Sequence, residues 1–126
     1  MKDFDSWNSL KKNIDERKNT PFANKRDIWW CSLGVNVGTE EDGKNELFER
    51  PVLVLRVLNK NTIRIAPLTS KNKNDDHNFP ISYNDREGSV IMSQIKTVNT
   101  KRLSRKLTRL DKSQFEKVMK KIRENL

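Results

Sequence analysis

The chain has 126 residues, with 26 Lys and Arg against 17 Asp and Glu, a formal net charge of +9 and a mean hydropathy of −0.90. A chain of this length buries roughly two thirds of the surface that its unfolded form exposes, so we expect one domain with a single core. It holds only 4 Gly and 4 Pro and contains dense apolar runs, which excludes collagen-like, low-complexity and disordered chains. No apolar stretch approaches the roughly 18 residues of a membrane span and no signal core follows the first charges, so a cytoplasmic protein is expected, with no membrane partner.

The charge is distributed unevenly along the chain. Residues 1–26 carry a net charge of +3, residues 27–49 a net charge of −5 and residues 50–126 a net charge of +11. A basic region of this size attracts polyanions through its summed field and gains from the counterions that they release. RNA or DNA is therefore the first partner class, and a solvated basic surface is the alternative.

The first element expected is an amphipathic helix over residues 4–14. Its apolar residues recur at the spacing of one helical face; they are Phe4, Trp7, Leu10 and Ile14. Pro21 ends the helical region, because the residue before a proline disfavours helical backbone. We therefore assign residues 1–25 to an N-terminal helix and linker, and residues 26–126 to the main domain.

Short strands are expected next, because runs rich in β-branched and aromatic residues alternate with polar turn sequences. The runs cover residues 27–33, 51–58, 62–68, 79–83 and 89–95. Strands in series, with helices only at the ends, indicate a strongly bent antiparallel sheet or barrel, a mainly β fold of the α+β class. A polar loop of about eleven residues precedes the second run, a length typical of functional or mobile segments.

The C-terminal part leaves one ambiguity. Residues 101–110 fit a helix through Leu103, Leu107 and Leu110, but the first two also fit one face of a strand. A helix is expected from residue 112 onward, started by a cap at Asp111 or Ser113. Its apolar face consists of Phe115, Val118, Met119 and Ile122.

Single copies of two residue types restrict the chemistry. One histidine, His77, excludes a pair of imidazoles, and one cysteine, Cys31, excludes an internal disulfide and a zinc set. Cys31 lies in an apolar run, where a small core residue is expected and a thiol nucleophile is the alternative. Neighbouring carboxylates such as Asp75 and Asp76 point to different sides, so we expect neither a metal site nor a cofactor.

The chemistry that remains is RNA self-cleavage, in which a ribose 2′-OH attacks the adjacent phosphorus. The enzyme must accept one proton, donate another to the leaving oxygen and neutralise the phosphorane. Arginine suits the last task because its planar fork pairs with two phosphate oxygens and keeps its charge. A Ser or Thr hydroxyl adds a hydrogen bond, and a glutamate serves as base where its surroundings raise its pKa.

Four sequence segments occur in an informative order. They are WWCSLGVNVGTEEDGK, ERPVLVL, IAPLTS and SVIMSQIKTVNTKRL. Together they resemble the PemK/MazF family of toxins from bacterial toxin–antitoxin pairs, over residues 26–126. The resemblance implies a small SH3-like antiparallel barrel with an added helix at each end, and a homodimer. It also implies metal-independent, sequence-specific cutting of single-stranded RNA at short sequences, which leaves 2′,3′-cyclic phosphate and 5′-OH ends. Silencing by a cognate antitoxin with an acidic tail is implied as well.

The resemblance also implies roles for single residues. Arg50 of the R-P step would stabilise the phosphorane and protonate the leaving oxygen, Thr69 would hold the scissile phosphate, and Glu40 would act as base or position the RNA. Contacts with RNA are expected from Lys44, Lys71, Ser93 and Gln94. The structural alternatives are an ordinary strand-edge arginine, an ordinary strand threonine, and a glutamine that only supports the fold.

Two features depart from the family pattern. Residues 44–49 intervene before the R-P step, which affects the position of Glu40, and Ser93 stands where an acidic residue is common. A catalytically inactive RNA- or antitoxin-binding module of the same fold is therefore the alternative function. A duplex-DNA-binding regulator is a further alternative, for which the sequence offers no recognition helix. The N-terminal helix would pack on the barrel, contribute to the dimer or help to dock the antitoxin.

Overall fold

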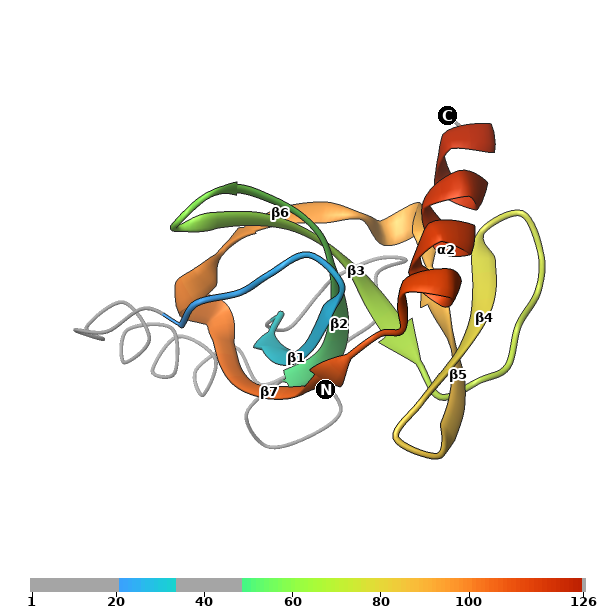
Figure 1. Cartoon of the computed structure of the whole chain (residues 1–126), viewed down its shortest axis with the longest axis horizontal. Coiled ribbons are helices and arrows are strands. Elements are labelled where there is room, and N and C mark those ends of the chain that lie inside the picture. The colour runs from blue at the N-terminus through green and yellow to red at the C-terminus, as the bar shows by residue number, and fades with distance from the viewer. Residues whose placement is uncertain (1–20, 34–48, 126) are drawn as a thin grey trace, which may run out of the picture.

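The computed structural model describes residues 21–33 and 49–125, which form a bent β-sheet and a C-terminal helix (Figure 1). The strands are β1 (Asp27–Ser32), β2 (Glu49–Asn59), β3 (Thr62–Thr69), β4 (Asn78–Tyr83), β5 (Arg86–Ile91), β6 (Lys96–Asn99) and β7 (Leu103–Arg109). Two 3₁₀ helices, η1 (Met92–Gln94) and η2 (Thr100–Arg102), flank β6, and α2 (Lys112–Glu124) follows β7. The helix expected over residues 4–14 lies outside the described residues.

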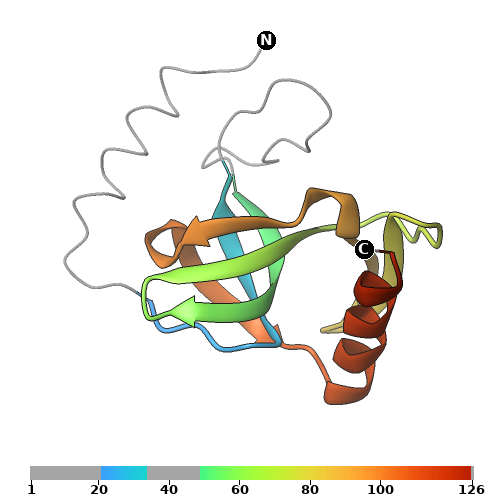
Figure 2. The same cartoon turned by 90° about the horizontal axis from the view of Figure 1, so that it is seen from above.

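All strand pairs are antiparallel, and the strand order is β4-β5-β3-β2-β1-β7, with β6 pairing separately with β3. The sheet is strongly bent but open, so it differs from the closed barrel that the resemblance implied. The cause lies in β3, whose first half pairs with β6 while its last two residues, Leu68 and Thr69, pair with β5. The sheet therefore divides at β3, and β4 and β5 swing away from the curled strands (Figures 1 and 2).

The ambiguous segment before α2 is a strand. Leu103 is fully buried and lies opposite Cys31 of β1. A helix there would remove the ladder that covers this edge of β1, so tertiary pairing decides between two acceptable local patterns. The expected run 89–95 is shorter than predicted, because β5 ends at Ile91 and η1 follows. Strand β6 after η1 was not expected.

Both faces of β2 are buried from Val52 to Leu55, which explains the apolar run VLVL, whereas residues 56–59 are exposed. Leu53 and Leu55 belong to a core cluster covered by α2 through Phe115 and Val118. The alternate residues of β2 face a second cluster inside the curl of the sheet; its members are Ala23, Trp29, Cys31, Val52, Val54, Ile63, Ile65 and Leu103. Helix α2 begins as expected, because the Asp111 carboxylate accepts a hydrogen bond of 2.9 Å from the Ser113 amide.

The fully buried carboxylate of Asp27 ties β1 to β7. It accepts hydrogen bonds from the Asn24 amide (2.9 Å), Trp29 Nε1 (3.3 Å) and Arg109 Nε (3.1 Å), and Lys106 Nζ lies 3.3 Å away. Burial by itself raises the pKa of Asp27, but these donors and the lysine charge together hold the pKa below its ordinary value. The ionised carboxylate is therefore part of the folded structure.

Replacing Asp27 with Asn tests this anchor. We expect the free energy of unfolding to fall by about 1–3 kcal/mol at pH 7, because buried donors lose their charged acceptor. Since folding lowers the pKa of Asp27, its contribution is present above the ordinary aspartate pKa and is lost as the pH falls through the folded-state value. The difference between wild type and variant should thus shrink in acid, as measured by urea unfolding from pH 7 to pH 3.

The exposed Asp76 supplies the matched control. Asp76→Asn should change stability by less than about 0.5 kcal/mol at either pH. Equal effects of the two substitutions would contradict the anchoring role of Asp27.

Candidate active site

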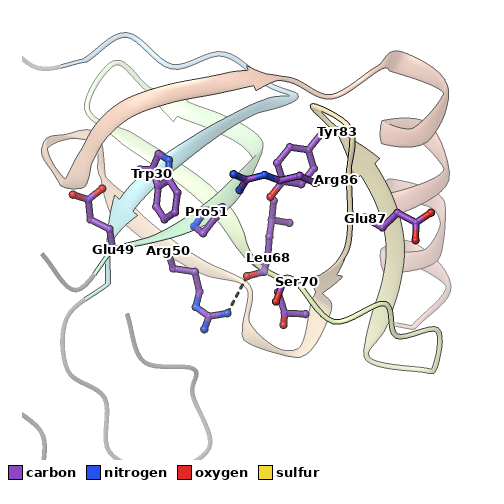
Figure 3. Close-up of a pocket in the computed structure, with 10 residues that line it drawn as sticks. Trp30, Glu49, Arg50, Pro51, Leu68, Ser70, Tyr83, Arg86 and Glu87 are labelled. Atoms are coloured by element: carbon purple, nitrogen blue, oxygen red, sulfur yellow. Dashed lines mark hydrogen bonds between the residues drawn. The ribbon is translucent and has the colours of Figure 1, made fainter. Parts of the chain in front are cut away.

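A pocket opens where the ends of β2 and β3 meet β1 and the β4–β5 hairpin (Figure 3). Residues from four parts of the chain line it: Trp30, Glu49, Arg50, Pro51, Leu68, Thr69, Ser70, Tyr83, Arg86 and Glu87. Arg50 and Thr69, two residues with expected catalytic roles, are both in this set. The structure therefore brings the R-P step and the P-L-T strand end to the same place.

The pairing of β2 with β3 accounts for this convergence. Val52 lies opposite Pro67 and Leu53 opposite Ala66. Continuing this register toward the start of β2 brings Arg50 level with Thr69. The Arg50 side chain is 2% exposed, and its Nη1 donates a hydrogen bond of 2.9 Å to the Leu68 carbonyl oxygen. The guanidinium is thereby oriented toward the end of β3 (Figure 3).

Thr69 is held at the last position of β3. It pairs with Ser89 of β5, is 6% exposed, and its Oγ1 accepts a hydrogen bond of 3.3 Å from the Lys71 amide. The buried Ser89 hydroxyl accepts a hydrogen bond of 2.6 Å from the Lys73 amide and lies 2.7 Å from the Lys71 carbonyl oxygen, to which it can donate. The turn after Thr69 is thus fastened to β5, and the Thr69 hydroxyl, which accepts from the Lys71 amide, can still donate its own hydrogen.

The remaining predicted residues are placed differently. Lys71 is exposed and follows the pocket residue Ser70 in the chain, whereas Gln94 is half-buried in η1. Ser93, also in η1, lines a separate cavity, so the structure does not bring it to Arg50 and Thr69; that cavity is formed by Asp76, His77, Met92, Ser93, Ile95, Ile122 and Asn125. Glu40 and Lys44 lie outside the described residues.

Two carboxylates line the pocket, and sequence analysis singled out neither. Glu49 is 1% exposed and accepts a hydrogen bond of 2.6 Å from the Ser104 hydroxyl, while Arg105 Nη1 lies 3.9 Å from the same oxygen. Arg105 also lies over the Trp30 ring, 4.8 Å from its centroid. Glu49 therefore links β2 to β7. The Glu87 carboxylate points away from the pocket (Figure 3).

The thiol alternative does not fit the surroundings of Cys31. The side chain is fully buried, and burial raises its pKa to about 12, although the charges of Arg102 and Lys96 act in the opposite direction. A thiol with this pKa is not a nucleophile at neutral pH. His77 is exposed, and its amide donates to Asp75 Oδ1 at 2.8 Å. Among the described residues, no three His, Cys, Asp or Glu side chains gather where a metal ion could bind.

Comparison with known proteins identifies the family. The sequence profile described as "PemK-like, MazF-like toxin of type II toxin-antitoxin system" matches residues 24–126. The chain belongs to this toxin family. No curated protein matches it significantly. Within the described part of this toxin-family chain, no helix is long and apolar enough to cross a membrane.

Solved structures share the fold. MazF from Deinococcus radiodurans superposes with a TM-score of 0.66 and 18% identity, over 82% of this chain and 96% of that chain. An endoribonuclease from a Mycobacterial species, in complex with its cognate antitoxin, gives 0.64 and 14%, over 82% and 93%. The Mycobacterium tuberculosis toxin MazF-mt6 gives 0.59 and 19%, over 79% and 95%. At these identities the likeness concerns the fold.

Gly88 is the point at which β5 approaches Thr69 in this toxin fold. A β-carbon at Gly88 would collide with the Thr69 backbone carbonyl oxygen. We expect Gly88→Ala to force the end of β3 away from β5 and to lower the free energy of unfolding by about 1–3 kcal/mol, the usual cost of overpacking. Denaturant unfolding measures this loss. Ser82→Ala, on the exposed side of neighbouring β4, is the control, and a similar loss in both variants would refute the explanation.

Proposed function

We propose that the chain is the toxin of a toxin–antitoxin pair and that it cuts single-stranded RNA by attack of a ribose 2′-OH, without a metal ion. The observation that carries this proposal is the meeting of Arg50 and Thr69 in one pocket. Family membership and the net charge of +11 over residues 50–126 support a polyanionic substrate. The cut would leave a 2′,3′-cyclic phosphate and a 5′-OH.

Arg50 would stabilise the charge that develops on the phosphorane. Its guanidinium is oriented by the Leu68 carbonyl before any substrate arrives, so little reorganisation is required during the reaction. Because the side chain is 2% exposed, water screens its charge weakly, and a phosphate in the pocket would feel a strong field. The same guanidinium would donate a proton to the leaving oxygen and regain one from solvent, while the base takes the proton of the attacking 2′-OH.

Thr69 would hold the scissile phosphate. Its oxygen already accepts a hydrogen bond from the Lys71 amide, so its hydroxyl hydrogen is directed to another acceptor. A phosphate oxygen between Thr69 and Arg50 would be that acceptor. Lys71 is exposed and follows the pocket residue Ser70, and its charge would attract the RNA backbone.

The general base is assigned to Glu40. The two carboxylates that line the pocket are poor candidates, because Glu49 is committed to Ser104 and Arg105 and Glu87 points away. A base therefore has to come from elsewhere, and Glu40 is the residue that the family motif selects. Lys44, Ser93 and Gln94 remain proposed RNA contacts.

The proposed partners follow from the family. Structures with this fold include a Mycobacterial endoribonuclease with its cognate antitoxin and a MazE–MazF pair from Deinococcus radiodurans. For this chain we propose an antitoxin with an acidic tail, which would compete with RNA for the basic surface, together with a homodimer and a cytoplasmic location.

Substitutions of Arg50 and Thr69 test the catalytic proposal. Arg50→Ala should lower the rate of RNA cutting by about 100- to 1000-fold, because one preorganised group facing the transition state is lost. Arg50→Lys keeps the charge but not the planar fork and should also be impaired. Thr69→Val replaces the hydroxyl with a methyl group of similar size and should also slow cutting, whereas Thr62→Val at the other end of β3 is its matched control and should not. The measurement is sequencing and end-group analysis of cleaved RNA, with EDTA present and absent.

Thermal melts must accompany these assays, because Arg50 is buried. If the folded variants cut as fast as wild type, the catalytic assignment is wrong. If wild type binds RNA in a salt-dependent manner but yields no cyclic phosphate, the inactive binding module is the better description. The departures at residues 44–49 and Ser93 favour that second outcome.

A further inference from the structure

The tip of the β4–β5 hairpin forms the wall of the pocket that faces Trp30 (Figure 3). Its two-residue turn, Asn84 and Asp85, has positive φ angles of 47° and 58°, which suits a tight hairpin. The turn pairs Tyr83 directly with Arg86. Side chains of directly opposed residues project from the same face of a sheet, so the aromatic ring and the guanidinium both reach the pocket.

The hairpin is fastened to the start of α2, which fixes where its tip lies. The Gln114 side chain accepts a hydrogen bond of 2.8 Å from the Ser82 amide and donates one of 2.8 Å to the Ser82 carbonyl oxygen. Its Nε2 also lies 2.8 Å from Asp111 Oδ2. Asn84 Nδ2 donates to the Leu107 carbonyl oxygen at 3.4 Å. Tyr83 and Arg86 are therefore held at a set position relative to the end of β3.

We propose that Tyr83 and Arg86 form a nucleobase subsite beside the phosphate position of Arg50 and Thr69. The proposal rests on the proposed function and deepens it by naming the residues that would read one base of the RNA. The chemistry of the wall differs from that of a phosphate site. Pro51, Leu68 and the rings of Trp30 and Tyr83 give the pocket an apolar lining, which suits the flat face of a base.

The ionisation of Tyr83 suits this role. Burial raises the pKa of Tyr83, although the Arg86 charge acts in the opposite direction, so the phenol is neutral at physiological pH. A neutral ring stacks on a base without repelling the neighbouring phosphates. The exposed Arg86 guanidinium carries only donors, so it selects a base edge made of acceptors. Guanine presents two such acceptors, O6 and N7, and is the base that we expect there.

Cleavage of a mixed single-stranded RNA pool, followed by sequencing of the new ends, tests the subsite in the full chain. We expect Tyr83→Ala to slow cutting by roughly 5- to 150-fold, the effect of losing one base–aromatic stack. Arg86→Gln should flatten the base preference at one position next to the cut and leave the other positions unchanged. Tyr83→Phe, which keeps the ring, should behave like wild type. Arg64→Gln, an exposed arginine of β3, is the matched control.

Tyr83 packs against the core cluster under α2, so Tyr83→Ala could lose activity by unfolding. Arg86→Gln alters an exposed side chain and keeps the test valid in that case. If Arg86→Gln and Tyr83→Ala both retain the wild-type rate and sequence profile, the subsite is refuted.

If the wild type cuts no RNA, the proposed function is overturned, but the subsite can still be tested by RNA binding. Binding of a fluorescent single-stranded RNA pool would then be compared between wild type, Tyr83→Ala, Arg86→Gln and Arg64→Gln. A loss of at least about 5-fold for the two hairpin variants alone supports a base-binding wall. Equal affinities for all four proteins overturn it.

Discussion

The antiparallel pairing of β2 with β3 is the constraint on which the pocket depends. It aligns the start of one strand with the end of the next, so residues 50 and 69, far apart in the sequence, become neighbours. The hydrogen bond from Arg50 Nη1 to the Leu68 carbonyl then sets the direction of the guanidinium. Because side chains alternate between the two faces of a strand, a slip of one residue would turn Arg50 to the opposite face. The relative position of Arg50 and Thr69 in the pocket therefore depends directly on the register of β2 and β3.

Two buried carboxylates, Asp27 at the start of β1 and Glu49 at the start of β2, link these strands to β7. Asp27 accepts hydrogen bonds from Arg109 of β7 and from the Asn24 amide ahead of β1, and Lys106 of β7 lies close to it. At the other end, Glu49 binds Ser104 and Arg105 of β7, next to Arg50. Burying these carboxylates costs solvation free energy, which is offset by three hydrogen bonds at Asp27 and by the Ser104 hydrogen bond and the Arg105 charge at Glu49. Of the two anchors, Glu49 lies in the pocket beside Arg50, so the contacts that join β2 to β7 also support the position proposed for the phosphate.

Much of the fold could be predicted from local patterns. The strand runs, the helix with its Asp111 cap and the family motifs depend on residues close together in sequence, where period and capping rules apply directly. Closure of the sheet could not be predicted in this way. Whether β3 continues beside one neighbour or changes to another depends on contacts across the whole molecule, and the change from β6 to β5 leaves the sheet open. The segment of β7 was ambiguous for the same reason, since its partner β1 is about 75 residues away.

For the site, the sequence by itself determined the family, the candidate roles of Arg50 and Thr69, and the excess of positive charge, because these reside in residue identity and order. Only the tertiary structure decided which other side chains join them. Tyr83 and Arg86 lie outside the four family segments, and Trp30 lies inside one without an assigned role. The three residues come from segments that meet through strand pairing and the Gln114 contact. Ser93 lies within a family segment but lines a different cavity, because β5 ends at Ile91 and η1 follows. Residue identity and local order determine the chemistry that a side chain offers, whereas long-range strand pairing determines which other side chains lie next to it.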